Sequence, residues 1–180
     1  MSSSYNNECV SGNLDKTVTN VVKLLERKGW TISTAESCTG GLLSELITSV
    51  SGASAVFELG ICTYSERIKS EFLGVPAADI AEYGVVSKEV ALEMVNGLKK
   101  RSGADVCVSV TGIAGPSGGT PEQPVGTVYI GFDVGGRQFV RLPELWKLPD
   151  RSRDNIRRSA AAFVFETLES LLAEGETINE

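Results

Sequence analysis

The segment 105–111, Asp-Val-Cys-Val-Ser-Val-Thr, is a mainly apolar run rich in β-branched residues, and Asp105 is its one charged residue. A strand with one face in water usually carries charged or large polar side chains at every second position, and this run carries none after Asp105, so it predicts a strand that is buried on both faces. Both faces of its sheet must then be covered by other elements. This requirement restricts the chain to layered folds in which the sheet lies in the middle.

Helical and extended patterns alternate along the rest of the chain. Apolar spacing and capping residues predict helices over 14–28, 41–50, 65–73, 88–101 and 151–172. Further strands are predicted over 31–35, 55–63, 126–134 and 137–146. Gly135-Gly136 separates the last two strands, which is typical of a β-hairpin and makes part of the sheet antiparallel. We therefore expect an α/β fold: a three-layer α/β/α sandwich with a mixed β-sheet, in a single domain.

Size and composition fit one globular domain. The chain has 180 residues, of which 42% are hydrophobic, and this is enough to bury a core. We expect the domain at 14–174, after a disordered N-terminal tail at 1–13 and before a C-terminal tail at 175–180. No apolar run approaches the roughly 18 residues of a membrane helix, and the polar start lacks the features of a signal peptide.

The net charge and the cysteine content limit which ligands and which cellular compartment the sequence predicts. A net charge of −6 leaves no basic footprint for nucleic acid, and the basic run at 151–158 is interpreted as the solvated start of a helix. Histidine is absent and the four cysteines form no Cys-x-x-Cys pair, so the sequence indicates no zinc site. The expected location is the reducing cytoplasm, away from membranes. The sequence leaves a homo-oligomer open.

The stretch 34–41, Thr-Ala-Glu-Ser-Cys-Thr-Gly-Gly, carries the groups best suited to chemistry. It stands where a strand passes into a helix, and the first N–H groups of a helix can receive an anion. Ser37 is interpreted either as a helix N-cap or as a nucleophile. Cys38 is either a competing nucleophile or a small buried residue, and Thr39 is either a second cap or a hydroxyl donor.

Because the chain lacks histidine, a serine nucleophile needs another base. Tyr64 and Lys69 lie at the next passage from strand to helix, and consecutive strand ends in a layered α/β fold can face one crevice. A lysine can act as a base only if burial or neighbouring positive charge lowers its pKa. The ordinary alternative for Lys69 is an exposed lysine on a helix.

The loop 112–124 contains four glycines and three prolines. Loops of this length in a compact domain are usually functional, and glycines allow backbone N–H groups to approach an anion. No Gly-Lys-Ser/Thr follows, so this is not a Walker loop. We expect a ligand-binding loop, with a rigid surface loop as the alternative.

Four motifs occur in order along the chain. They are Ala-Glu-Ser-Cys-Thr-Gly-Gly at 35–41, Tyr-Ser-x-x-x-Lys followed by Leu-Gly-Val at 64–75, Gly-Val-Val-Ser at 84–87, and Thr-Gly-Ile-Ala-Gly-Pro-Ser-Gly-Gly-Thr-Pro at 111–121. Together they resemble the CinA-type C-terminal domain, in its standalone form, over roughly 18–171. The resemblance implies a nicotinamide-nucleotide amidase that deamidates nicotinamide mononucleotide to nicotinic acid mononucleotide and ammonia. Glu66 departs from the asparagine that many members carry, which bears on substrate preference.

The resemblance also implies a serine–lysine mechanism without a metal or cofactor. Ser37 matches the nucleophile and Lys69 the base, while Tyr64 lies near the reacting centre and is expected to pass a proton to the leaving ammonia. The N–H groups of Thr39 and Gly40 are expected to hold the oxyanion. The residues expected to bind the substrate are Glu36, Thr39, Gly40, Gly41, Gly112, Ala114, Gly115, Ser117, Gly118 and Gly119.

Two other functions stay open at this point. A thiol amidase would use Cys38 in place of Ser37. A non-catalytic nucleotide-binding or regulatory protein, linked to competence or the DNA-damage response, would bind the mononucleotide without releasing ammonia.

Overall fold

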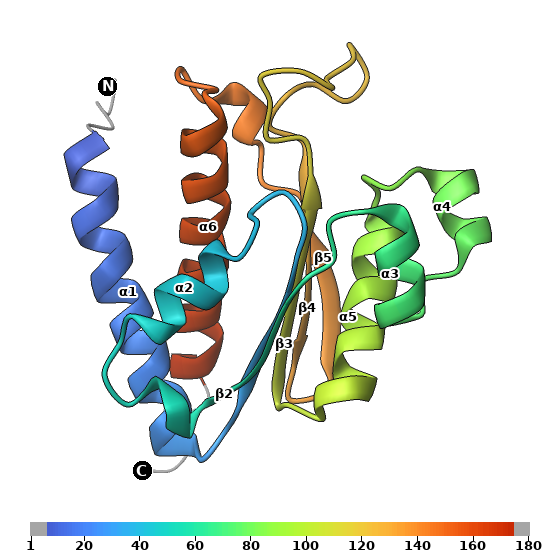
Figure 1. The fold of residues 1–180 in the computed structure, drawn as a ribbon. Helices are drawn as coiled ribbons and strands as arrows, with labels where there is room; N and C mark the ends of the chain where they lie inside the picture. The colour runs from blue at the N-terminus through green and yellow to red at the C-terminus, as the bar shows by residue number, and fades with distance from the viewer. Residues whose placement is uncertain (1–6, 175–180) are drawn as a thin grey trace.

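A computed structural model describes residues 7–174 as a five-stranded sheet with helices on both faces (Figure 1). The strands are β1 (Ile32–Glu36), β2 (Phe57–Cys62), β3 (Val106–Gly112), β4 (Val128–Val134) and β5 (Arg137–Arg141). The helices are α1 (Asn7–Lys28), α2 (Leu42–Thr48), α3 (Glu66–Leu73), α4 (Ala77–Tyr83), α5 (Lys88–Ser102) and α6 (Arg153–Glu174). Short 3₁₀ turns lie at Ala53–Ala55 and Leu145–Lys147.

The sheet has the strand order β2-β1-β3-β4-β5 and is mixed. β2, β1 and β3 run parallel, whereas β4 is antiparallel to β3 and β5 is antiparallel to β4. Helices α1, α2 and α6 pack together on one face, and α3, α4 and α5 cover the other (Figure 1). The expected α/β fold, a three-layer sandwich around a mixed sheet, is confirmed.

Each face of the sheet has its own hydrophobic core, and β3 contributes to both. Val106, Val108 and Val110 join the core under α1 and α6, while Cys107 joins the core under α5. Every residue of β3 except the last is buried, as the apolar run predicts. Within residues 7–174, no helix is both long and apolar enough to span a membrane.

The parallel strands decide where a functional site can form. Because β1, β2 and β3 run in the same direction, their carboxyl ends lie at one edge of the sheet, where α/β folds bind ligands. The turn between β1 and α2, the passage from β2 to α3, and the long loop after β3 therefore meet at the upper edge in Figure 1.

Two boundaries and one short helix differ from the expectations. Helix α1 begins at Asn7, inside the expected tail at 1–13, and residues 1–6 and 175–180 lie outside the described residues. The short helix α4 was not predicted; it follows Pro76 and buries only one residue, so it shows no helical periodicity. Strand β5 ends well before residue 146, because Pro143 has no N–H to donate to a ladder.

Candidate active site

Ser37 and Lys69 meet at the carboxyl edge of the parallel strands. Ser37 directly follows β1, and its N–H donates to the Val110 carbonyl of β3 at 3.0 Å, which fixes its backbone against the sheet. Lys69 lies in α3, a helix that begins where the Ser65 hydroxyl accepts a hydrogen bond from the Ile68 N–H. Lys69 Nζ lies 3.0 Å from Ser37 Oγ. The two groups are within hydrogen-bond distance of each other.

The Lys69 side chain is completely buried, unlike an ordinary lysine on a helix. Burial lowers the pKa of Lys69 from 10.5 to about 8, because a charged amine is poorly solvated there. Nζ also faces the carbonyls of Thr63 at 2.7 Å and Tyr64 at 3.5 Å. A neutral amine can donate one N–H to each carbonyl and keep its lone pair for the Ser37 hydroxyl. The arrangement suits a general base.

Glu36, which was expected to bind substrate, instead anchors the start of α2. Its carboxylate is fully buried and accepts hydrogen bonds from the N–H groups of Gly41, Leu43 and Ser44 at 3.0–3.1 Å and from the Ser44 hydroxyl at 2.9 Å. Four bonds use the acceptor capacity of a carboxylate, and the negative charge is stabilised at a helix N-terminus. In the structure Glu36 thus shapes the turn that carries Ser37, and a role in substrate binding stays a prediction.

This anchoring gives a stability prediction. Glu36→Gln replaces one acceptor oxygen with an amide that faces backbone N–H groups, so we expect the free energy of unfolding to fall by roughly 3 kcal/mol. Urea denaturation at pH 7 measures this value. The control Glu45→Gln changes an exposed residue within α2. The free energy of unfolding of this variant should stay within about 0.5 kcal/mol of the wild-type value. Equal losses in the two variants would contradict the anchoring role.

The turn between β1 and α2 uses some of its N–H groups in its own hydrogen bonds and leaves two without an acceptor among the described residues. The Gly40 N–H donates to the Ser37 carbonyl at 3.1 Å, and the Gly41 N–H is held by the carboxylate described above. Among residues 7–174, no other residue accepts a hydrogen bond from the N–H groups of Cys38 and Thr39. The Gly40 N–H is thus already engaged, so its oxyanion role stays a prediction, and the N–H groups of Cys38 and Thr39 are further candidate donors.

The environment of Cys38 disfavours a thiol nucleophile. Its side chain is buried, and burial raises the pKa of the thiol to about 11. Only a thiolate is an effective sulfur nucleophile, and little thiolate forms at neutral pH when the pKa is so high. Cys38 belongs to the hydrophobic core on the α1 and α6 face.

A cavity of about 180 Å³ opens beside Ser37. Segments from five parts of the chain surround it: the turn after β1, the passage after β2, the segment before α5, the loop after β3 and the start of α6. The lining residues are Ser37, Cys38, Tyr64, Val85, Val86, Thr111, Gly112, Ala114 and Arg153. Four predicted site residues thus share one cavity: Ser37, Tyr64, Gly112 and Ala114. The described residues contain no group of three Cys, Asp or Glu side chains that could hold a metal ion.

The other predicted binding residues do not line this cavity. The Thr39 hydroxyl is buried and has no hydrogen-bond partner among the described residues. Ser117, Gly118 and Gly119 line a second hollow of about 430 Å³ along the same loop, together with Arg151. The loop therefore divides its residues between two neighbouring recesses.

Packing explains part of the glycine content of this loop. A Cβ atom on Gly112 would lie 2.7 Å from the Thr127 carbonyl, and one on Gly119 would lie 2.7 Å from the Val125 backbone nitrogen. Gly115 has a φ of +80° and would bring a Cβ to 2.6 Å from the Val125 side chain. These glycines let the loop fold closely onto the segment that leads into β4.

Arg153 lines the cavity beside Ser37, a position that the sequence alone does not indicate. It donates to the Gly115 carbonyl at 2.8 Å and to the Tyr64 hydroxyl at 3.1 Å, so it joins the loop to the passage after β2. The Tyr64 side chain is 63% exposed, and its hydroxyl faces Arg153. Arg153 belongs to the basic run at 151–158. The sequence alone favours a solvated helix face for this run and does not show that one of its arginines reaches the cavity.

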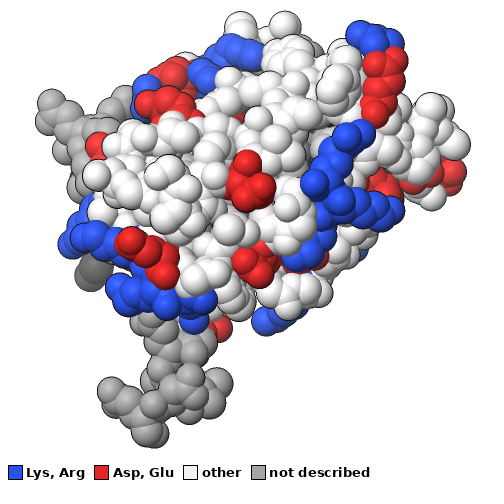
Figure 2. Space-filling view, turned by 60° about the horizontal axis from the view of Figure 1, so that its bottom comes forward, with Lys and Arg blue, Asp and Glu red and all other residues white. Residues whose placement is uncertain are grey.

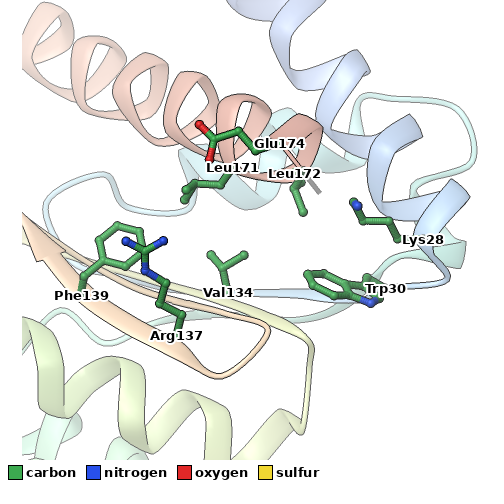
Figure 3. A pocket seen from close by; sticks show the side chains of 8 residues that line it. All are labelled: Lys28, Trp30, Val134, Arg137, Phe139, Leu171, Leu172 and Glu174. Atoms are coloured by element: carbon green, nitrogen blue, oxygen red, sulfur yellow. The ribbon is translucent and has the colours of Figure 1, made fainter. Parts of the chain in front are cut away.

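A separate pocket of about 190 Å³ lies at the opposite end of the sheet (Figure 3). It is lined by Lys28, Trp30, Val134, Arg137, Phe139, Leu171, Leu172 and Glu174. None of these side chains is a hydroxyl or a thiol, so the pocket lacks a serine- or cysteine-type nucleophile. On the face that includes this end of the molecule, basic and acidic side chains are interspersed (Figure 2). The candidate serine nucleophile and its neighbouring amine lie at the other end of the sheet, at Ser37 and Lys69.

Comparison with known proteins identifies the family of the chain. Residues 14–172 match the CinA C-terminal domain. A CinA-like protein of Kosmotoga olearia is 48% identical over 146 residues, which make up 81% of this chain and 34% of that protein. The nicotinamide-nucleotide amidohydrolase PncC of Enterobacter agglomerans is 45% identical over 144 residues, or 79% of this chain and 85% of that protein. The chain thus spans about a third of the length of the first curated relatives and most of the length of PncC.

The solved structures include a protein of the same fold. The competence/damage inducible protein CihA of Agrobacterium tumefaciens superposes with a TM-score of 0.83 at 35% identity, covering 88% of this chain and 94% of that protein. The resemblance carried by the four motifs is confirmed. The chain belongs to the CinA C-terminal domain family.

Proposed function

We propose that this protein hydrolyses the carboxamide of nicotinamide mononucleotide to nicotinic acid mononucleotide and ammonia by a serine–lysine mechanism. The observation that carries the proposal is the 3.0 Å contact between Lys69 Nζ and Ser37 Oγ, made by a buried amine whose pKa is lowered to about 8. The similarity to a nicotinamide-nucleotide amidohydrolase supports the choice of substrate.

In the first step, the neutral amine of Lys69 takes the proton of the Ser37 hydroxyl as Oγ attacks the amide carbon. A tetrahedral intermediate forms, and its oxyanion accepts hydrogen bonds from the N–H groups of Cys38 and Thr39. Losing one such donor typically costs about 10²–10³ in rate.

In the second step, the protonated Lys69 gives its proton to the amide nitrogen. The carbon–nitrogen bond breaks, ammonia leaves, and an ester joins the nicotinoyl group to Ser37. Lys69 is neutral again and removes a proton from a water that attacks the ester, and the same proton returns to Ser37 Oγ. Lys69 replaces Tyr64 as the proton carrier in this scheme, because the Tyr64 hydroxyl is directed to Arg153.

The phosphate of the substrate is assigned to the loop 115–119. Arg151 lines the recess formed by this loop, and Arg153 lines the cavity beside Ser37. A guanidinium binds phosphate oxygens through paired N–H groups, and Arg153 has donors beyond those it gives to Gly115 and Tyr64. Tyr64, being largely exposed, is free to cover one side of the bound nucleotide.

Ammonia release from nicotinamide mononucleotide tests this function. Purified protein should produce ammonia and nicotinic acid mononucleotide in equal amounts, measured by an enzyme-coupled ammonia assay and by chromatography. Nicotinamide riboside, which lacks the phosphate, should react with a higher KM. Calorimetric binding of the mononucleotide without any ammonia would favour the non-catalytic alternative and reject the amidase.

A further inference from the structure

Arg157 reaches from α6 to the turn that follows Ser37. Its Nε and Nη2 both donate to the Thr39 carbonyl, at 3.2 and 2.7 Å. Helices α2 and α6 lie on the same face of the sheet (Figure 1), so this contact joins the last helix to the turn before α2. The acidic neighbour of Arg157, Asp154, lies 4.0 Å away and is mostly exposed. The principal partner of Arg157 is therefore a backbone carbonyl.

The turn needs such a restraint. The one turn hydrogen bond that the Thr39 carbonyl accepts, from the Leu42 N–H, is long at 3.4 Å. Gly40 and Gly41 follow with φ values of +61° and +95°, and they have no side chains to pack. Glycine in such conformations loses the most freedom when it is ordered. A fixed contact on the Thr39 carbonyl limits the movement of the whole turn.

The restrained carbonyl lies next to the two N–H groups of the turn for which no other described residue is an acceptor. The Thr39 carbonyl and the Thr39 N–H belong to adjacent peptide planes, and the Cys38 N–H lies one residue earlier. Oxyanion donors accelerate a reaction only if they are held in place before the charge develops. Arg157 does not line the cavity beside Ser37, so it would act through Thr39 rather than on the substrate.

We propose that Arg157 is a positioning residue of the hydrolytic site, one that holds the Thr39 carbonyl so that the N–H groups of Cys38 and Thr39 are preorganised for the oxyanion. This inference rests on the function proposed above. It assigns the basic run at the start of α6 two tasks: Arg153 lines the cavity, and Arg157, one helical turn later, orients the turn that carries the nucleophile.

Kinetics of three variants test the proposal. Arg157→Ala should lower kcat for nicotinamide mononucleotide by about 10- to 100-fold, the loss expected from a displacement of about 1 Å at the reacting centre, with little change in KM. Arg157→Lys should recover part of kcat, because an ammonium can reach the carbonyl but lacks the fixed pair of donors. The control Arg158→Ala removes a half-exposed residue paired with Asp154 and should behave as wild type.

A second readout does not require amidase activity. A fluorophosphonate probe reacts at serine when Oγ attacks phosphorus: the oxygen–phosphorus bond forms, fluoride leaves, and the serine proton passes to the base. Mass spectrometry gives both the rate and the final fraction of protein labelled at Ser37, with Ser37→Ala as the blank. Arg157→Ala should label more slowly than wild type but reach the same final fraction. A merely structural role would lower the final fraction and the unfolding temperature instead.

The two readouts separate the two proposals. If wild type releases no ammonia but labels at Ser37, and Arg157→Ala slows that labelling, the amidase proposal fails and the positioning role stands. If Arg157→Ala labels at the wild-type rate, the positioning role is overturned whatever the substrate is. Absence of labelling in wild type would overturn it too, because no preorganised oxyanion site would then exist at Ser37.

Discussion

Ser37→Ala is expected to lower ammonia release from nicotinamide mononucleotide by about 10⁴-fold or more, because the variant has no group that can form the acyl-enzyme ester. The replaced hydroxyl is small and almost buried, so its loss should leave the affinity for the mononucleotide nearly unchanged. Single-turnover assays with enzyme in excess measure the residual rate, and calorimetry measures the affinity. A variant that keeps its rate would remove Ser37 from the mechanism.

Cys38→Ala is the matched control for this experiment. The neighbouring thiol is buried and has a pKa of about 11, so it stays protonated in the pH range of the assay. We expect the variant to keep most of its kcat and an alkylating reagent to have little effect on wild type. A loss of activity in Cys38→Ala with full activity in Ser37→Ala would identify a thiol amidase instead.

The fold could be predicted because its main constraint is local in the sequence. The apolar run that became β3 requires cover on both faces, and the glycine pair at 135 and 136 identifies the β4–β5 hairpin. Helix α4 could not be predicted in this way. It buries only Ile80, so its position depends on packing against α3 and α5 and not on a periodic pattern.

The sequence predicts the approximate place of the candidate site, because parallel strands end at one edge of the sheet. The types of residue after β1 and β2 make Ser37 and Lys69 candidates, and the family resemblance favours them over a helix cap and an exposed lysine. Only the fold could bring their side chains to 3.0 Å. The reach of Glu36 into α2 and of Arg157 to the Thr39 carbonyl depends on side-chain direction. A charged residue next to a nucleophile can equally face a ligand or a helix end, and the sequence does not distinguish these cases.

Lys69 gives the second large effect, through the pH dependence of activity. Because the base is the neutral amine and its pKa is about 8, kcat/KM should rise with pH and level off above a midpoint near that value. Lys69→Met, which fills a similar volume without the amine, should lose about 10³-fold or more and lose the pH dependence. Initial rates of ammonia release between pH 6 and 10 measure both outcomes; a flat profile in wild type would argue against Lys69 as the base.

The same variant tests the lowered pKa without any substrate. The Lys69 amine has a pKa of about 8 in the folded protein and an ordinary value of 10.5 in the unfolded chain. Between these values the unfolded state binds more protons, so the folded state gains stability as the pH rises. The free energy of unfolding of wild type, relative to Lys69→Met, should therefore increase by about 3 kcal/mol from pH 7 to 10.5 and stay constant below pH 7. Subtracting the variant cancels the other titrating groups, so a constant difference in urea denaturation across this range would mean that Lys69 keeps an ordinary pKa and is charged when the reaction begins.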